Sequence, residues 1–180
     1  MRAPVGLALL VAGCIPTTAL APLLPSYRDA SVPIASKADL DAARFAGRWH
    51  EVARFPVPFQ SDCDRAVAEY GPPRAGTLSV RNLCRDEAGR VTRSIEGSAR
   101  VVGPGRLEVR LDGVPFRAPY WVLWVDEGYR TAVVGTPDGR AGWLLNREEN
   151  LPRDRFLSAL KVFEFNGFDT SRLIVAPPNE

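Results

Sequence analysis

The sequence predicts an all-β domain, an eight-stranded antiparallel up-and-down β-barrel with one C-terminal α-helix packed outside. Three observations lead to this prediction. From residue 47 onward apolar and polar residues alternate with a period of two, the period of a strand with one buried face. Short turn sequences rich in glycine and proline separate the alternating segments at regular intervals. A single late segment has the spacing of a long helix.

The composition fits one globular domain without a strong external field. The chain has 180 residues, 46% hydrophobic and 24% charged, which is enough for a sizeable core. Its formal net charge is +2, and residues of both signs are interspersed. No charged block would steer the protein to nucleic acid, so no nucleic-acid partner is expected.

Residues 1–13 predict a lipoprotein signal peptide. One arginine precedes an apolar run far shorter than the roughly 20 residues that span a bilayer. The run ends in LVAGC (residues 10–14), which resembles a bacterial lipobox. Cys14 would then carry several acyl chains, palmitate among them, and anchor the protein to the membrane. A rival cleavage site at residues 19–21 is followed by Pro22, a poor context for the ordinary signal peptidase.

The predicted localisation is the bacterial outer membrane, with the protein lipid-anchored on its periplasmic side. By resemblance to bacterial lipoproteins, Ile15 after the cysteine, in place of aspartate, favours the outer membrane. Residues 14–36 are rich in proline and predict a stiff tether ahead of a domain at 37–180. The alternative is a plain secretory signal in which Cys14 is incidental.

Taken in order, the segments of period two predict the strands of the barrel. The segment 119–126 is apolar on both faces, so its outer side must be covered as well. The expected strands are 48–55, 64–70, 77–84, 91–101, 106–112, 119–126, 129–135 and 141–147. Joined by hairpins, they would close into a barrel without exposed edges.

Helices are expected on either side of the strands. Residues 152–166 have Phe156, Leu160 and Phe163 at helical spacing, and this helix can cover the outside of the barrel. Residues 36–39 can cap a short helix from 40 to 45 before the first strand. Residues 172–175 can add a short closing strand.

Cys63 and Cys84 remain once Cys14 is assigned to the anchor. An even pair in an oxidising compartment predicts a disulfide. Cys84 shares strand parity with Asn82, whereas Cys63 has the opposite parity to Ala66. A bridge therefore requires Cys63 to lie in a loop or beside a bulge. Two free buried thiols are the alternative.

Three motifs follow one another along the chain: GRW at 47–49, YWVL at 120–123 with Asp126 and Tyr129, and WLLNRE at 143–148. In this order and at these separations they resemble the lipocalin family over about residues 37–177. The resemblance is nearest to bacterial lipocalins of the outer membrane lipoprotein type and to apolipoprotein D. One departure is Trp124, where small residues are common; facing inward, it would shrink the cavity.

The resemblance implies roles for particular residues. Trp49 would close the narrow end of the barrel, with Gly47 before it and Arg147 across its ring. The implied ligand-binding residues are Tyr70, Asn82, Leu111 and Trp143, with Tyr120 as a further candidate. Arg65, Arg81 and Arg117 could meet a carboxylate or phosphate at the mouth, and the favoured alternative is that they are solvated surface arginines.

The implied function is to bind, store or transport a small hydrophobic ligand, such as a fatty acid or a lysophospholipid, as a monomer or homodimer. No cofactor or metal is expected. The one histidine, His50, faces away from Trp49, and the sequence has no motif of a hydrolase or metalloenzyme. An enzyme that uses an unpaired Cys84 as its nucleophile is one alternative. A scaffold whose barrel is filled by its own side chains is the other.

Overall fold

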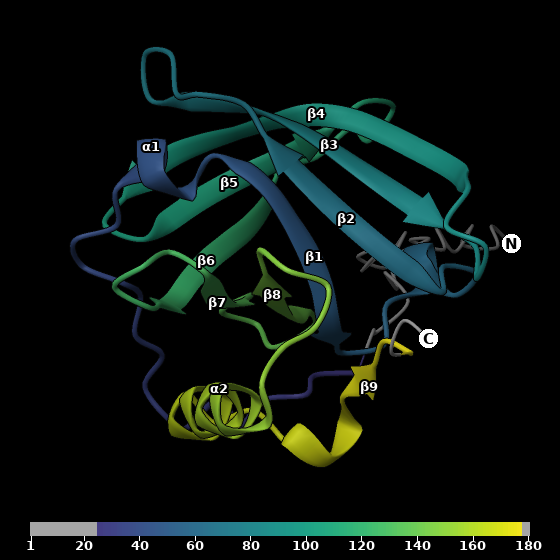
Figure 1. Cartoon of the computed structure of the whole chain (residues 1–180). Helices are drawn as coiled ribbons and strands as arrows, with labels where there is room; N and C mark the ends of the chain where they lie inside the picture. Colours follow the sequence, from purple (N-terminus) through teal and green to yellow (C-terminus); the bar gives the residue numbers. More distant parts are fainter. Residues whose placement is uncertain (1–24, 178–180) are drawn as a thin grey trace, which may run out of the picture.

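The computed structural model describes residues 25–177, which form a nine-stranded antiparallel sheet closed into a barrel (Figure 1). Strands β1 to β8 follow one another around the ring, and β1 closes it by pairing with both β2 and β8. The predicted up-and-down barrel is confirmed. The strands are β1 Gly47–Arg54, β2 Arg65–Tyr70, β3 Thr77–Arg85, β4 Val91–Gly103, β5 Arg106–Leu111, β6 Ala118–Val125, β7 Thr131–Gly135 and β8 Gly142–Asn146.

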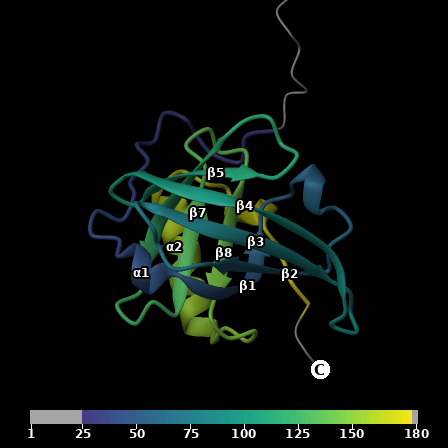
Figure 2. The ribbon, with the colours of Figure 1, turned by 90° about the horizontal axis from the view of Figure 1, so that it is seen from above.

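The barrel has a closed end and a mouth. β1 starts at the closed end, where α1 (Ala42–Phe45) precedes it, and runs to the mouth. The loop 55–64 at the mouth contains the 3-10 helix η1 (Pro58–Gln60). Seen from above, the long strands β3 and β4 cross over β7, β8 and α2, so the ring is flattened into two layers (Figure 2).

The short helix α1 is capped one residue before it begins. Residues 36–39 were expected to cap a helix from 40 to 45, and this expectation is wrong. The cap is Asp41, whose carboxylate accepts hydrogen bonds from the backbone N–H groups of Ala43 and Arg44. An aspartate in this position satisfies donors that the first turn leaves open.

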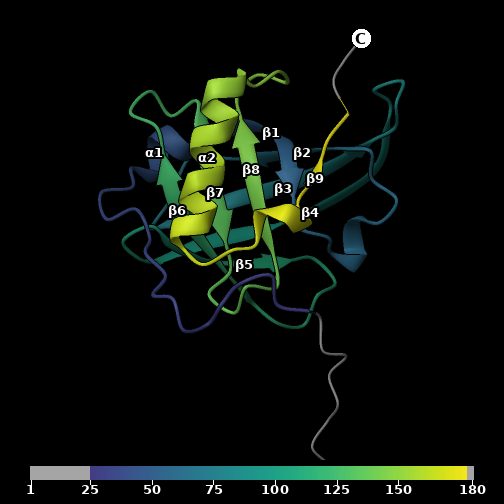
Figure 3. The ribbon, with the colours of Figure 1, turned by 90° about the horizontal axis from the view of Figure 1, so that it is seen from below.

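The outside of β6, β7 and β8 is covered by α2 (Arg153–Phe165), as predicted (Figure 3). Phe163 of α2 is fully buried against the outer face of the barrel, beside Phe55 and Phe168. An irregularity in β6 between Val122 and Trp124 changes the alternation of its side chains. As a result Trp124 packs in this outer layer, and it does not reduce the space inside the barrel.

The chain ends and the segment before α1 also lie on the outside. After the 3-10 helix η2 (Thr170–Arg172), β9 (Ile174–Val175) pairs with the end of β1. Residues 25–36, the second part of the predicted tether, lie against the barrel. Tyr27 is buried there, donates to the carbonyl of Pro56, and stacks on Phe55.

Cys14, the signal peptide at 1–13 and the tether residues 14–24 lie outside the described residues. Within residues 25–177, no helix has the length and apolar character needed to cross a bilayer.

The closed end is built around Trp49. Its side chain is fully buried, and its Nε1 donates to the carbonyl of Phe45 at 2.8 Å. The guanidinium of Arg147 lies over the indole, with its Cζ 3.8 Å from the ring centroid. This kind of contact stabilises a fold by about 0.5–2 kcal/mol.

Arg147 also connects three segments through backbone carbonyls. It donates to Arg44 in α1 at 2.8 Å, to Arg48 in β1 at 2.8 Å and to Tyr129 in the β6–β7 turn at 3.1 Å. Gly47 passes beneath it with a φ of 103°, and a Cβ at this position would lie 3.0 Å from Arg147 Nη1. Both the backbone conformation and the close approach therefore favour glycine.

Trp49→Ala is expected to lower the free energy of unfolding by about 3–5 kcal/mol, because it removes a large buried aromatic and leaves Arg147 without its ring. The measurement is the urea midpoint, with the slope checked for constancy. Phe165→Ala, at a side chain 75% exposed on α2, is the control and should change stability by no more than about 0.5 kcal/mol. Equal midpoints for the two variants would contradict the structural role of Trp49.

Candidate ligand-binding site

The interior of the barrel divides into two halves. On five strands the inward side chain nearer the closed end is at most 5% exposed: Tyr70, Val80, Leu107, Val122 and Leu145. On each of these strands the next inward side chain toward the mouth is partly exposed: Ala68, Asn82, Val109, Tyr120 and Trp143. We call these the closed half and the mouth half. Solvent reaches the mouth half, whereas side chains fill the closed half.

The four predicted ligand-binding residues fall on this division. Asn82, Leu111 and Trp143 are partly exposed in the mouth half, on β3, β5 and β8. Tyr70 lies lower and is 5% exposed, within the packed cluster of the closed half. All four share the inward parity of their strands, so the structure brings them to one interior, with Tyr70 at its boundary.

A row of aromatic rings runs through the interior from the closed end to the mouth. Trp49 contacts Phe45 with ring centroids 5.0 Å apart, and Phe45 contacts Tyr70 at 5.2 Å. The row continues to Tyr120 at 6.2 Å and from there to Trp143 at 5.8 Å. The hydroxyls of Tyr70 and Tyr120 are hydrogen-bonded at 2.8 Å, so these two strands are linked across the lumen.

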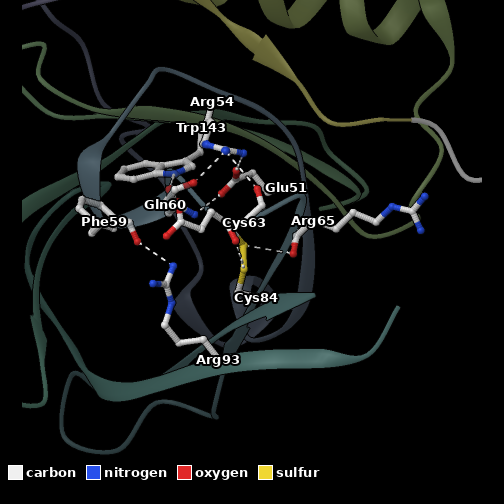
Figure 4. Close-up of polar contacts among 10 residues, drawn as sticks. Glu51, Arg54, Phe59, Gln60, Cys63, Arg65, Cys84, Arg93 and Trp143 are labelled. Carbon is white, nitrogen blue, oxygen red and sulfur yellow. Dashed lines mark hydrogen bonds and ion pairs between the residues drawn. A yellow bond between two sulfur atoms is a disulfide. The ribbon is translucent and has the colours of Figure 1, made fainter. Parts of the chain in front are cut away.

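A buried ion pair lies near the mouth, close to Trp143 (Figure 4). Arg54 Nη1 donates to Glu51 Oε1 at 3.0 Å, and the two side chains are only 9% and 6% exposed. Gln60 donates to the other oxygen of Glu51 at 2.9 Å and accepts a hydrogen bond from Trp143 Nε1 at 3.0 Å. Burial raises the pKa of Glu51, although Arg54 and Gln60 act in the opposite direction.

This cluster holds the mouth loop 55–64 in place from inside. Arg54 Nη2 donates to the backbone carbonyls of Gln60 and Cys63 at 3.0 and 3.1 Å. Arg93 donates to the carbonyl of Phe59 at 3.0 Å from the opposite rim. Loops usually move more than the elements they join, and here several bonds restrict one that borders the entrance.

The predicted disulfide is confirmed, and it fixes the same loop. Cys63 lies in the loop just before β2 and is bonded to Cys84 near the end of β3. The position of Cys63 in a loop resolves the conflict of strand parity. Because Cys84 is bonded to Cys63, its sulfur is not a free thiolate, which removes the basis for a cysteine nucleophile at this position.

The predicted arginines at the mouth have different positions. Arg81 is an exposed surface arginine on the outer face, 3.9 Å from Glu96, and it does not lie at the entrance. The guanidinium of Arg65 is directed away from Glu51 and Arg54 in Figure 4. Arg117 is exposed in the loop before β6. Arg93 was not predicted as a mouth residue from the sequence. It lies on β4 two residues from Ile95, which is paired with Asn82, so Arg93 has the same inward parity.

His50 is on the outer face, with the opposite parity to Trp49, as its position in the strand predicts. Its Nδ1 lies 3.7 Å from a carboxylate oxygen of Glu149. Burial lowers the pKa of His50, against the opposing charge of Glu149. Among residues 25–177, no group of three or more histidine, cysteine and acidic side chains is arranged to hold a metal ion.

Comparison with known proteins agrees with this architecture. The family model described as a lipocalin-like domain matches residues 40–178. The chain belongs to the lipocalin family. The outer membrane lipoprotein Blc of Escherichia coli K12 is 33% identical over 139 residues, covering 76% of this chain and 78% of that protein. Apolipoprotein D of Macaca fascicularis is 28% identical over 147 residues, covering 76% of each.

The fold of this lipocalin is also that of solved structures. Lobster apocrustacyanin A1 superposes with a TM-score of 0.63 at 17% identity, covering 87% of this chain and 94% of that one. At this level of identity the likeness concerns the fold alone. The resemblance seen in the three sequence motifs is therefore confirmed as family membership.

Three polar residues of the mouth half were not identified as site residues from the sequence. Glu51 could have been found, because it has the parity of Trp49 and so faces inward. Arg54 could not, because the register of β1 against β8 shifts between Glu51 and Ala53 and turns the residues after it. Gln60 lies in a loop, where no periodicity indicates direction.

An alkaline titration tests the hydrogen-bonded tyrosine pair. Burial raises the pKa of Tyr70 to about 12 and raises the pKa of Tyr120 well above its usual value, compared with about 10 for a free phenol. The unfolded chain therefore loses these protons at a lower pH than the folded protein does. The free energy of unfolding should fall as the pH rises from about 10 toward the pKa values of the folded state.

The measurement is phenolate absorbance of the folded protein across this range, followed by urea midpoints at each pH. The double variant Tyr70→Phe/Tyr120→Phe should lose the late ionisation, while the urea-unfolded protein should ionise all its tyrosines near about 10. A single early step for all four tyrosines of the folded protein would contradict the raised pKa values of this pair.

Proposed function

We propose that this lipocalin binds a small hydrophobic ligand, such as a fatty acid or a lysophospholipid, in the mouth half of its barrel, and stores or transports it while lipid-anchored in the bacterial envelope. The observation that carries the proposal is the change from burial to partial exposure along the inner face of five strands, from the closed end toward the mouth. Membership of the lipocalin family supports a binding role. The 33% identity to an outer membrane lipoprotein supports the location.

The lining supports an apolar ligand body. Val109, Leu111, Ile95 and Trp143 offer partly exposed apolar surface on the inner face. Burying such surface contributes about 25 cal/mol per Å² of apolar area, so most of the affinity would come from the ligand's hydrocarbon part. Asn82 could donate to or accept from a polar group of the ligand.

The charges near the mouth support a ligand whose charged group stays at the rim. Inside, Glu51 and Arg54 neutralise each other, and both oxygens of Glu51 are already hydrogen-bonded. A buried carboxylate or phosphate would therefore find no uncompensated cation there and would lose its hydration. At the rim, Arg93 and Arg117 are exposed and could meet such a group in water.

The alternative is a scaffold that binds no ligand and offers its surface to a partner protein. The closed half favours this alternative, because side chains fill it completely: Trp49, Phe45, Leu78 and Val122 are each 0% exposed. Ligand titration distinguishes the two proposals.

Lipid-free protein titrated with a fatty acid or a lysophospholipid should show saturable quenching of tryptophan fluorescence and a saturable heat in calorimetry. Trp143→Phe should lose most of the quenching, since Trp143 borders the ligand. Trp121→Phe is the matched control and should keep it, because Trp121 lies on the outer face under the guanidinium of Arg106. Folded protein that gives neither quenching nor heat would favour the scaffold.

The lipid anchor is tested separately in cells. Cys14→Ser should abolish labelling with radioactive palmitate and move the protein from the membrane fraction to the soluble periplasmic fraction. Ala21→Arg, which disables the rival cleavage site, should leave labelling and location unchanged. The reverse pattern, in which only Ala21→Arg alters processing, would indicate a plain secretory signal.

A further inference from the structure

We propose that the hydrogen-bonded pair Tyr70–Tyr120 is the floor of the ligand chamber, and that it limits the length of hydrocarbon chain that the barrel can bury. The inference rests on the proposed binding of a ligand in the mouth half. It concerns which ligands fit there.

The pair crosses the lumen. Tyr70 belongs to β2 and Tyr120 to β6, which lie on opposite sides of the ring of eight strands. Their hydroxyls meet at 2.8 Å. Each ring is also held by a neighbour, since Tyr70 packs on Phe45 at 5.2 Å and Tyr120 stacks on Trp143 at 5.8 Å with an angle of 28° between ring planes. Neither ring can turn aside without losing these contacts.

The crossing coincides with the boundary between buried and exposed side chains. Tyr70 is 5% exposed and belongs to the closed half, whereas Tyr120 is partly exposed and belongs to the mouth half. Beyond the pair, toward the closed end, the inward residues Leu78, Ala99 and Val122 are all 0% exposed. A ligand chain that enters at the mouth would therefore meet the two rings and, behind them, a packed core.

The strand-lined space above the floor is limited. Tyr70 is paired with Val80, and β3 continues from Val80 to Arg85, which at about 3.3 Å per residue is roughly 16 Å of strand. With a strand tilt of about 40°, the depth along the barrel axis is roughly 13 Å. A membrane acyl chain spans half of a hydrocarbon core about 30 Å thick, or roughly 15 Å. The end of an extended membrane-length chain would thus stay outside the strand-lined part of the barrel.

The test is a series of saturated fatty acids on the full-length, lipid-free protein: octanoate, decanoate, laurate, myristate and palmitate. Dissociation constants are measured by calorimetry below the concentration at which each acid forms micelles. As long as the added carbons are buried, each further pair of CH₂ groups should lower the dissociation constant about fifteen-fold, because a buried CH₂ contributes about 0.8 kcal/mol. In the natural protein this gain should stop by laurate. We call the chain length at which it stops the break.

Tyr120→Ala removes one ring of the floor and should move the break to myristate or palmitate. Trp121→Ala is the control, because the neighbouring residue on the same strand faces outward and contacts Arg106. Its break should stay where it is in the natural protein. Tyr120→Leu, which keeps the interior apolar, replaces Tyr120→Ala if circular dichroism shows that the alanine variant is unfolded.

The outcomes separate the floor from the proposed function. A break that shifts only in the Tyr120 variants supports the floor. Affinity that rises without a break to palmitate in the natural protein overturns the floor and leaves ligand binding intact. A break that stays in place in a folded Tyr120 variant also overturns it. Folded natural protein that binds no acid of the series overturns the proposed function, and the floor with it.

Discussion

The contact between Trp49 and Arg147 is the constraint on which the rest of the barrel depends. An up-and-down barrel must bring its first strand back to its last, and a strand pair alone leaves one end open to water. Here the guanidinium lies 3.8 Å from the indole centroid and bonds carbonyls of α1, β1 and the β6–β7 turn. One side chain from the segment after β8 therefore ties the start of β1 to the opposite turn.

Because Trp49 closes one end, the burial of the inward side chains changes along the barrel axis. Aromatic and branched side chains fill the part nearest Trp49, and partly exposed side chains line the part nearest the mouth. The polar cluster of Glu51, Arg54 and Gln60 lies at the wide end. There it keeps the loop 55–64 fixed, and the disulfide between Cys63 and Cys84 joins the same loop to β3. Side-chain packing therefore holds the closed end together, whereas hydrogen bonds, an ion pair and a disulfide hold the entrance.

Most of the fold could be predicted from the sequence, because the period of two survives in nearly every strand and the turns carry glycine and proline. The exceptions have a common physical cause. At Trp124 and Arg54 a local shift of register changes which face the following side chains take. The cap of α1 was misplaced because several residues of the capping type lie close together, and Asp41 is the one whose carboxylate reaches the open N–H groups.

The candidate site was partly predictable for the same reason. Tyr70, Asn82, Leu111 and Trp143 were named through the family resemblance, and they lie in regular strands, where the period of two agrees with their inward direction. Gln60 and the loop that carries it have no periodicity, and their position depends on contacts between residues far apart in the sequence, such as Gln60 with Trp143. The pairing of Tyr70 with Tyr120 is of this kind too, because it joins strands that are not neighbours in the sheet.

The course of residues 25–36 has a consequence for how an anchored domain would be oriented. Tyr27 bonds the carbonyls of Pro56 and Gly139, both in loops at the mouth, and the chain then crosses the outside of the barrel to α1 at the closed end (Figure 1). The chain that precedes residue 25 therefore joins the domain beside the mouth. With the proposed lipid on Cys14, the tether to the bilayer would therefore start beside the entrance of the barrel and not at its closed end.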